Sequence, residues 1–190
     1  MPLGYDALVD LVLPQLPRET GYVLLAESFS GPVAIKIASL APPGLAGLIF
    51  CATFAKNPSP WLKALKPVAR RFSIKSIPRW IRAPLMWGRV QPKAAPAQVD
   101  RAVAGVANEV LQHRLVSVLE ADESQRLKML KLPVLILEAR RDLLLPRRAA
   151  RLLVQSLPQA NHRVIDGPHL LLQARPLDCA AAVKEFMRGL

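Results

Sequence analysis

Residues 22–34 read YVLLAESFSGPVA and join two elements of different type. The apolar run 22–25 predicts a short buried strand. The apolar sequence that begins at Pro32 predicts a helix, with the proline in the first turn, where its missing N–H does no harm. Only residues 26–31, most of them small, separate the two elements. A strand that passes straight into a helix makes a sharp bend, and the residue at its apex points away from the sheet. That residue is Ser28.

A bend of this kind suits nucleophilic catalysis, because it holds the Ser28 hydroxyl clear of the sheet. The N–H of Phe29 opens the following helix, so it can donate to an oxyanion with the helix dipole behind it. The alternative interpretation is a serine in an ordinary strand-to-helix connection, as in a nucleotide-binding sheet.

The apolar segment 45–52 predicts a second buried strand after the turn at residues 41–44. A helix between two wholly apolar strands indicates a βαβ unit and therefore a mostly parallel sheet covered by helices on both faces. The same patterns predict further strands at 132–138 and 162–165 and helices at 5–14, 147–157 and 177–187.

Residues 57–130 have a different character, with frequent prolines and basic residues and no alternation typical of strands. We expect short helices broken by prolines and then one longer helix at 100–119. We interpret this stretch as a helical insertion that forms a lid over the sheet. The alternative is a helical subdomain with no role in substrate access. The insertion contains prolines 58, 60, 67, 78, 84, 92 and 96 and the tryptophans Trp61, Trp80 and Trp87.

Length and composition indicate one globular domain of 190 residues, with a core formed by residues 1–56 and 131–190. No apolar run approaches the roughly 18 residues of a membrane span, and the first residues lack a signal-peptide pattern. Cys51 and Cys179 lie far apart in apolar surroundings, which predicts buried free thiols in a reducing cytoplasm. No cysteine or histidine cluster has metal-ligand spacing, so we expect no metal site.

The net charge of +12 is unevenly distributed, since residues 28–99 contain eleven Lys or Arg and no carboxylate. Such a block can attract phospholipid, nucleic acid or an anionic substrate, but it is more often a solvated helical face. No nucleic-acid-binding motif is present, so we expect no nucleic acid partner. Because we interpret the basic block as a solvated face, we also expect no binding to membrane surfaces. The sequence carries no signal for an oligomeric state.

Three residues have the types and positions that serine catalysis needs. A serine hydroxyl needs a base, for which histidine is suited, and the imidazole needs a carboxylate to orient it. Ser28, Asp142 and His169 each follow a predicted strand, so a parallel sheet would bring them to one edge. Asp166 is the rival acid, and Asp142 could instead be a turn-capping residue. We expect the other two histidines, His113 and His162, at the surface.

The order Ser28, Asp142, His169 and the surrounding segments resemble the α/β-hydrolase family. The segments are AESFSG at 26–31, PVLILEARRD at 133–142 and DGPH at 166–169. The first resembles the family's nucleophile elbow, although Ala26 and Ser30 replace its two glycines. The resemblance implies a serine hydrolase that cleaves a carboxylic ester or related acyl bond of a small molecule without a cofactor. Ser28 would attack, His169 would move the proton, Asp142 would orient it and the Phe29 N–H would bind the oxyanion.

The resemblance also implies strands and a glycine-rich turn before the helix at 5–14, and that turn would supply a second oxyanion N–H. The sequence starts directly before this helix, so we expect a partial, N-terminally truncated α/β-hydrolase fold. The alternative function is accordingly a catalytically weak or inactive scaffold or interaction module.

Overall fold

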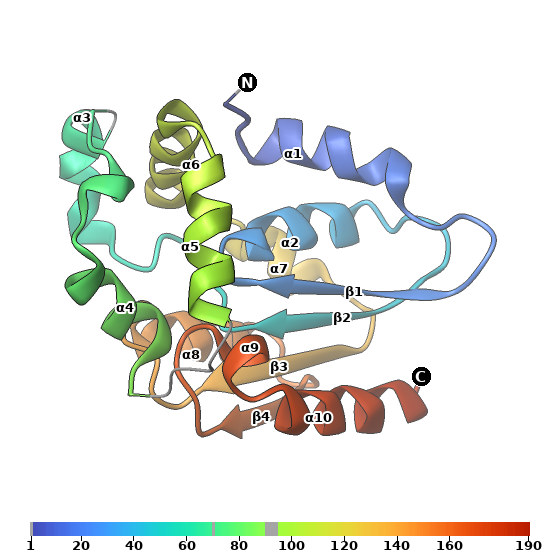
Figure 1. Cartoon of the computed structure of the whole chain (residues 1–190). Helices are drawn as coiled ribbons and strands as arrows, with labels where there is room; N and C mark the ends of the chain where they lie inside the picture. The colour runs from blue at the N-terminus through green and yellow to red at the C-terminus, as the bar shows by residue number, and fades with distance from the viewer. Residues whose placement is uncertain (1, 70, 90–94) are drawn as a thin grey trace.

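A parallel sheet of four strands, in the order β1-β2-β3-β4, lies between layers of helices (Figure 1). A computed structural model describes residues 2–69, 71–89 and 95–190. Because all strand pairs are parallel, the four carboxyl ends meet at one edge. The mostly parallel sheet predicted from the sequence is therefore confirmed. The strands are β1 (Tyr22–Glu27), β2 (Leu45–Cys51), β3 (Val134–Ala139) and β4 (Asn161–Ile165).

Alternate residues of β2 and β3 pack against different helical layers, which explains why these strands are apolar throughout. Leu48, Phe50 and Ile136 belong to a core shared with α2 (Gly31–Ser39), α7 (Ser124–Met129) and α8 (Arg147–Ser156). On the other face, Ile49 and Leu135 pack against α9 (Leu171–Ala174) and α10 (Pro176–Arg188). Both cysteines lie in this second core as free thiols, as predicted.

The helix after Ser28, α2, is buried nearly all round because other elements cover both of its sides. One side packs on the sheet, while Val33 and Ile37 on the other side meet Tyr5 and Val9 of α1 (Tyr5–Val12). A 3-10 turn, η1 (Leu13–Gln15), follows this first helix and contains Pro14, near which the helix was expected to end. Helix α2 is thus fixed between the sheet and α1.

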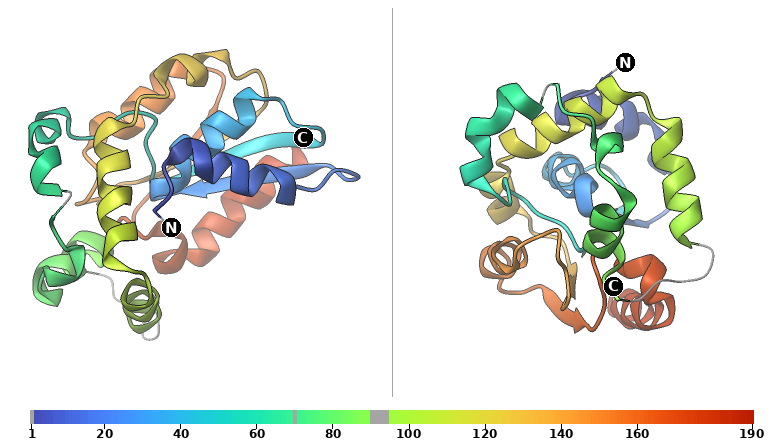
Figure 2. Two further views of the ribbon diagram at one scale, coloured as in Figure 1. Left: turned by 90° about the horizontal axis from the view of Figure 1, so that it is seen from above. Right: turned by 60° about the vertical axis from the view of Figure 1, so that its left-hand side comes forward.

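Apart from α7, which packs on the sheet, residues 57–130 form short helical elements that lie beyond the carboxyl ends of the strands (Figures 1 and 2). The single helix expected at 100–119 is wrong, because the chain leaves helical geometry after Gly105 and Ala107 is extended, with ψ 146°. Glycine is a poor helix former, so it favours this break. Residues 70 and 90–94, with Pro92, lie outside the described residues. The elements before α7 are η3 (Pro60–Leu65), α3 (Lys66–Ala69), η4 (Ile74–Ser76), α4 (Arg79–Trp87), α5 (Ala95–Gly105) and α6 (Asn108–Glu120).

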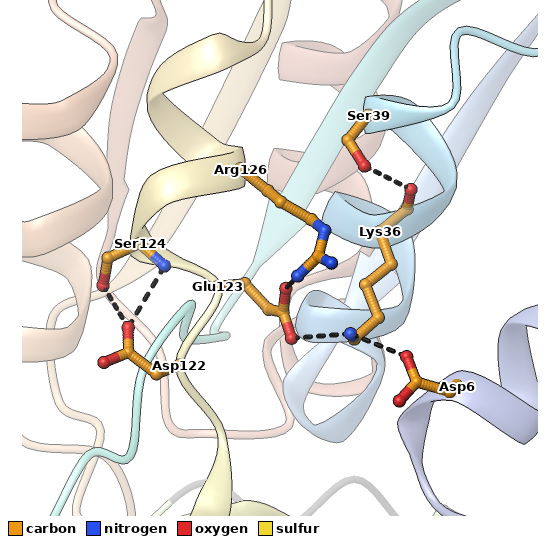
Figure 3. Close-up of polar contacts among 7 residues, drawn as sticks. All are labelled: Asp6, Lys36, Ser39, Asp122, Glu123, Ser124 and Arg126. Carbon is orange, nitrogen blue, oxygen red and sulfur yellow. Dashed lines mark hydrogen bonds and ion pairs between the residues drawn. The ribbon is translucent and has the colours of Figure 1, made fainter.

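An ion-pair network centred on the nearly buried side chains of Lys36 and Glu123 joins α1, α2 and the start of α7 (Figure 3). Lys36 Nζ lies 2.8 Å from Asp6 and 3.1 Å from Glu123, and Glu123 also binds Arg126 at 2.8 Å. Burial alone would lower the pKa of Lys36, but its hydrogen bonds to the two carboxylates raise it above the usual value. Lys36 therefore stays charged, and it links α2 to the end of the insertion.

We expect Glu123→Gln to lower the free energy of unfolding by about 2 kcal/mol, because it leaves Lys36 with only an exposed partner. The side chain of Lys36 is 13% exposed and that of Glu123 6%, whereas that of Asp6 is 90% exposed. Urea unfolding followed by circular dichroism measures the loss. Glu120→Gln is the matched control, since its pair with Lys66 is partly exposed and should contribute below about 1 kcal/mol. Equal losses in the two variants would contradict a special role for Glu123.

Candidate active site

Ser28, His169 and Asp142 form a continuous row of hydrogen bonds at the carboxyl edge of the sheet. Ser28 Oγ lies 2.7 Å from His169 Nε2, and His169 Nδ1 lies 2.7 Å from Asp142 Oδ2. A carboxylate only accepts hydrogen bonds, so the tautomer protonated at Nδ1 satisfies both contacts. His169 is 1% exposed. The three residues predicted to share this edge therefore do meet there, in an arrangement that allows a proton to pass from Ser28 to Nε2.

Ser28 stands at the sharp bend expected between strand and helix. It follows β1 directly and begins a 3-10 turn, η2 (Ser28–Ser30), that leads into α2, and its φ is +53°. A positive φ is uncommon for residues other than glycine, and it costs on the order of 1–3 kcal/mol unless the surroundings fix it. The Thr53 hydroxyl helps to fix it by donating a hydrogen bond to the Ser28 carbonyl. Thr53 lies shortly after β2 and is not part of a recognisable motif. This contact could therefore not be predicted from the sequence.

Asp142 is both an acid that contacts the histidine and a turn-capping residue. Its Oδ1 accepts hydrogen bonds from the N–H groups of Leu144 and Leu145, each at 2.8 Å, while Oδ2 faces His169. The rival acid, Asp166, binds Arg141 at the surface, and this hydrogen bond lowers the pKa of Asp166. The carboxylate that contacts the imidazole in this structure is therefore that of Asp142.

Phe29, the residue after Ser28, is held between two side chains from distant elements. The Tyr5 ring of α1 stacks on it with centroids 4.9 Å apart, and the Arg114 guanidinium of α6 lies 5.6 Å from its centroid. Burial raises the pKa of Tyr5, so its phenol stays neutral. This stack fixes the segment that carries the Phe29 N–H, and no sequence motif indicated it.

The other histidines are less exposed than expected. His162 lies 2.8 Å from Glu138, and both side chains are partly buried. His113 Nδ1 is buried and has no hydrogen-bond partner in the described part of the chain. Both residues are therefore partly buried, not fully exposed at the surface as predicted. Within the described residues, neither forms a hydrogen bond with Ser28. The histidine that does so is His169.

The three tryptophans of the insertion differ in their surroundings. Trp61 and Trp80 are 71% and 76% exposed, whereas Trp87, at the end of α4, is 3% exposed. Next to it, the carbonyl of Met86 accepts a hydrogen bond of 3.1 Å from the N–H of Leu170, directly after the histidine. The insertion thus contacts the histidine loop through the end of α4.

Residues 2–69, 71–89 and 95–190 contain no group of three or more His, Cys, Asp or Glu side chains arranged to hold a metal ion. Burial raises the pKa of the Cys179 thiol to about 11, so this sulfur is a poor nucleophile and ligand. None of the helices in the described ranges has the length and hydrophobicity that a bilayer-spanning segment requires.

Comparison with known proteins places the sequence in a family. Residues 4–171 match the family model described as serine aminopeptidase, S33. Curated protein sequences contain no significant match. Among solved structures, the chain is similar to the enol-lactonase from Burkholderia xenovorans LB400, with a TM-score of 0.77 and 17% identity over 98% of this chain and 74% of that one.

Two further structures show the same likeness of fold. A thermophilic esterase from Thermogutta terrifontis has a TM-score of 0.72 and 24% identity over 100% of this chain and 74% of that one. A bromoperoxidase from Bacillus anthracis has a TM-score of 0.75 and 15% identity over 99% of this chain and 75% of that one. The chain therefore spans about three quarters of the length of these structures.

Proposed function

Because the chain belongs to the serine aminopeptidase S33 family of α/β-hydrolases, we propose that it is a serine hydrolase for a carboxylic ester or related acyl bond. The observation that carries the proposal is the unbroken row from Ser28 Oγ through His169 to Asp142, with 2.7 Å at each contact. The proposed substrate is a small molecule. The buried free thiols support a reducing, cytoplasmic environment.

The proposed reaction follows from the direction of the hydrogen bonds. Ser28 Oγ attacks the acyl carbonyl while its proton moves to His169 Nε2, which is unprotonated when Nδ1 donates to Asp142. Asp142 then stabilises the imidazolium without taking the proton itself. Nε2 returns the proton to the leaving oxygen, which departs and leaves an acyl group on Ser28. Water, activated by the same imidazole, hydrolyses this acyl-enzyme and restores the serine.

The Phe29 N–H is the proposed donor to the oxyanion, because it follows the nucleophile at the positive end of η2 and α2. One such donor contributes roughly 3 kcal/mol to transition-state stabilisation. The stack of Phe29 with Tyr5 and Arg114 supports this role, since it limits movement of the donor. We propose further that residues 57–130 act as the lid, with Trp87 as the tryptophan that packs at the site loops.

A fluorophosphonate probe tests the proposed function, because it reacts covalently with a serine that a neighbouring base activates. We expect the 190-residue chain to be labelled at Ser28, as identified by mass spectrometry of the labelled peptide, and Ser28→Ala to abolish labelling. Ser30→Ala is the matched control, since its hydroxyl donates only to the Glu27 carbonyl, and it should remain labelled. Undiminished labelling of Ser28→Ala would remove Ser28 from the mechanism. A wild-type chain without labelling would favour the inactive-scaffold alternative.

A further inference from the structure

A hollow of about 550 Å³ lies on the outer side of the turn that carries Asp142. It is lined by three segments that meet at the carboxyl edge of the sheet: residues 87–89 after α4, residues 140–147 before and at the start of α8, and residues 167–168. Asp142 is among the lining residues, whereas Ser28 and His169 are not. The hollow is therefore a space separate from the nucleophile, and its volume lies in the range of small-molecule sites.

Positive charge at the hollow exceeds the negative charge around it. Of its four arginines, only Arg141 has a carboxylate partner, Asp166. The Asp142 carboxylate is occupied by His169 and by two backbone N–H groups. The guanidinium groups of the other three form no ion pair within residues 2–69, 71–89 and 95–190. These three are Arg89, Arg140 and Arg147.

Arg147 adds a second positive contribution through its position. It is the first residue of α8, a helix of ten residues. The N-terminal N–H groups of a helix produce a positive potential that favours an anion. A guanidinium also presents two parallel N–H groups that match the oxygens of a phosphate or carboxylate.

Apolar side chains line the same hollow. Trp87 and Pro168 are buried at its wall, and Leu143 is 60% exposed although it is a large apolar residue. An inorganic ion would leave this surface in water. A molecule with both an apolar body and an anionic group would use both parts of the hollow.

We propose that this hollow is a binding site for an organic anion of about the size of an aryl phosphate. Its phosphate or carboxylate group is bound by Arg89, Arg140 and Arg147, and its apolar part lies against Leu143. The site is distinct from the proposed acyl site, so it does not depend on catalysis at Ser28.

Isothermal titration with phenyl phosphate at low ionic strength tests this site. We expect saturable binding of one molecule per chain, at least tenfold weaker binding in Arg140→Gln/Arg147→Gln, and much weaker binding of phenol. Arg101→Gln/Arg151→Gln is the matched control, because it removes the same charge from exposed positions outside the hollow and should change the affinity less than twofold. Wild type with Ser28 blocked by the fluorophosphonate should bind as tightly as the free protein.

Each competing explanation gives a different result. Equal weakening in the two double variants would show diffuse attraction to a basic surface and overturn the proposal. Loss of binding after Ser28 is blocked would assign phenyl phosphate to the acyl site instead. Inorganic phosphate that binds as tightly as phenyl phosphate would refute the role of Leu143. The single variant Arg147→Gln, with an exposed side chain on a helix, provides a second measurement if the double variant folds poorly.

Discussion

Asp142→Asn is expected to lower kcat for ester hydrolysis by about ten-thousand-fold with little change in KM. The N–H groups of Leu144 and Leu145 hold Oδ1 of residue 142, so an asparagine keeps its oxygen on that side. Its NH₂ group then faces His169 Nδ1 and can only donate. The imidazole is thereby forced into the tautomer with the proton on Nε2, which cannot accept the proton of Ser28.

Steady-state hydrolysis of p-nitrophenyl butyrate measures this effect. Asp166→Asn is the matched control, because its carboxylate binds Arg141 at the surface, and it should keep kcat within about threefold of wild type, as surface ion pairs contribute little. The urea midpoint of each variant shows whether it is folded. A larger loss in Asp166→Asn than in Asp142→Asn would transfer the orienting role to Asp166.

Gly31→Ala is expected to lower kcat by about a hundredfold, because it displaces the support of the nucleophile. A Cβ at residue 31 would lie 2.1 Å from Thr53 Oγ1 and 2.8 Å from the Phe54 carbonyl oxygen. The first clash moves the hydroxyl that donates to the Ser28 carbonyl, and the second involves backbone that cannot rotate away. Such overpacking also costs about 1–3 kcal/mol of stability.

Gly105→Ala is the matched control, since a Cβ there meets no atom within 4 Å. It should leave kcat unchanged and stabilise the protein slightly, because alanine favours helix. Gly31→Ala/Thr53→Ala removes the clash with Oγ1, whereas the backbone clash and a tight approach of 3.2 Å to the Cβ of residue 53 remain. We therefore expect partial recovery of stability but not of kcat. The same kinetic assay and urea unfolding measure both quantities. Wild-type kcat in Gly31→Ala would show that the bend does not need this close approach.

The core of the fold could be predicted from the sequence because its strands are short apolar runs bounded by turn residues. The segments 22–25 and 45–52 are examples, and the parallel pairing of β1 with β2 follows from the helix between them. The insertion was harder to predict. The apolar spacing of 100–119 continues across Gly105, so periodicity alone did not reveal that α5 and α6 are separate helices.

The meeting of Ser28, Asp142 and His169 could be predicted because a parallel sheet brings the ends of its strands together. The contacts that support them could not. Thr53 reaches the Ser28 carbonyl from the end of another strand, and Arg114 reaches Phe29 from the insertion. Such contacts depend on how distant elements pack in three dimensions, which local spacing does not encode.

The hydrogen bond from the Leu170 N–H to the Met86 carbonyl joins α4 to the loop that carries His169. An outward movement of α4 would break this bond and loosen the loop that presents His169. Loop movements that admit substrate occur on microsecond to millisecond timescales. In the open conformation, in which substrate and product can exchange, the loop would hold the His169 imidazole less firmly. Closure would restore its position. Substrate entry and the chemical step would thus require different conformations of this loop. The hydrogen bond from the Leu170 N–H would be present in only one of them.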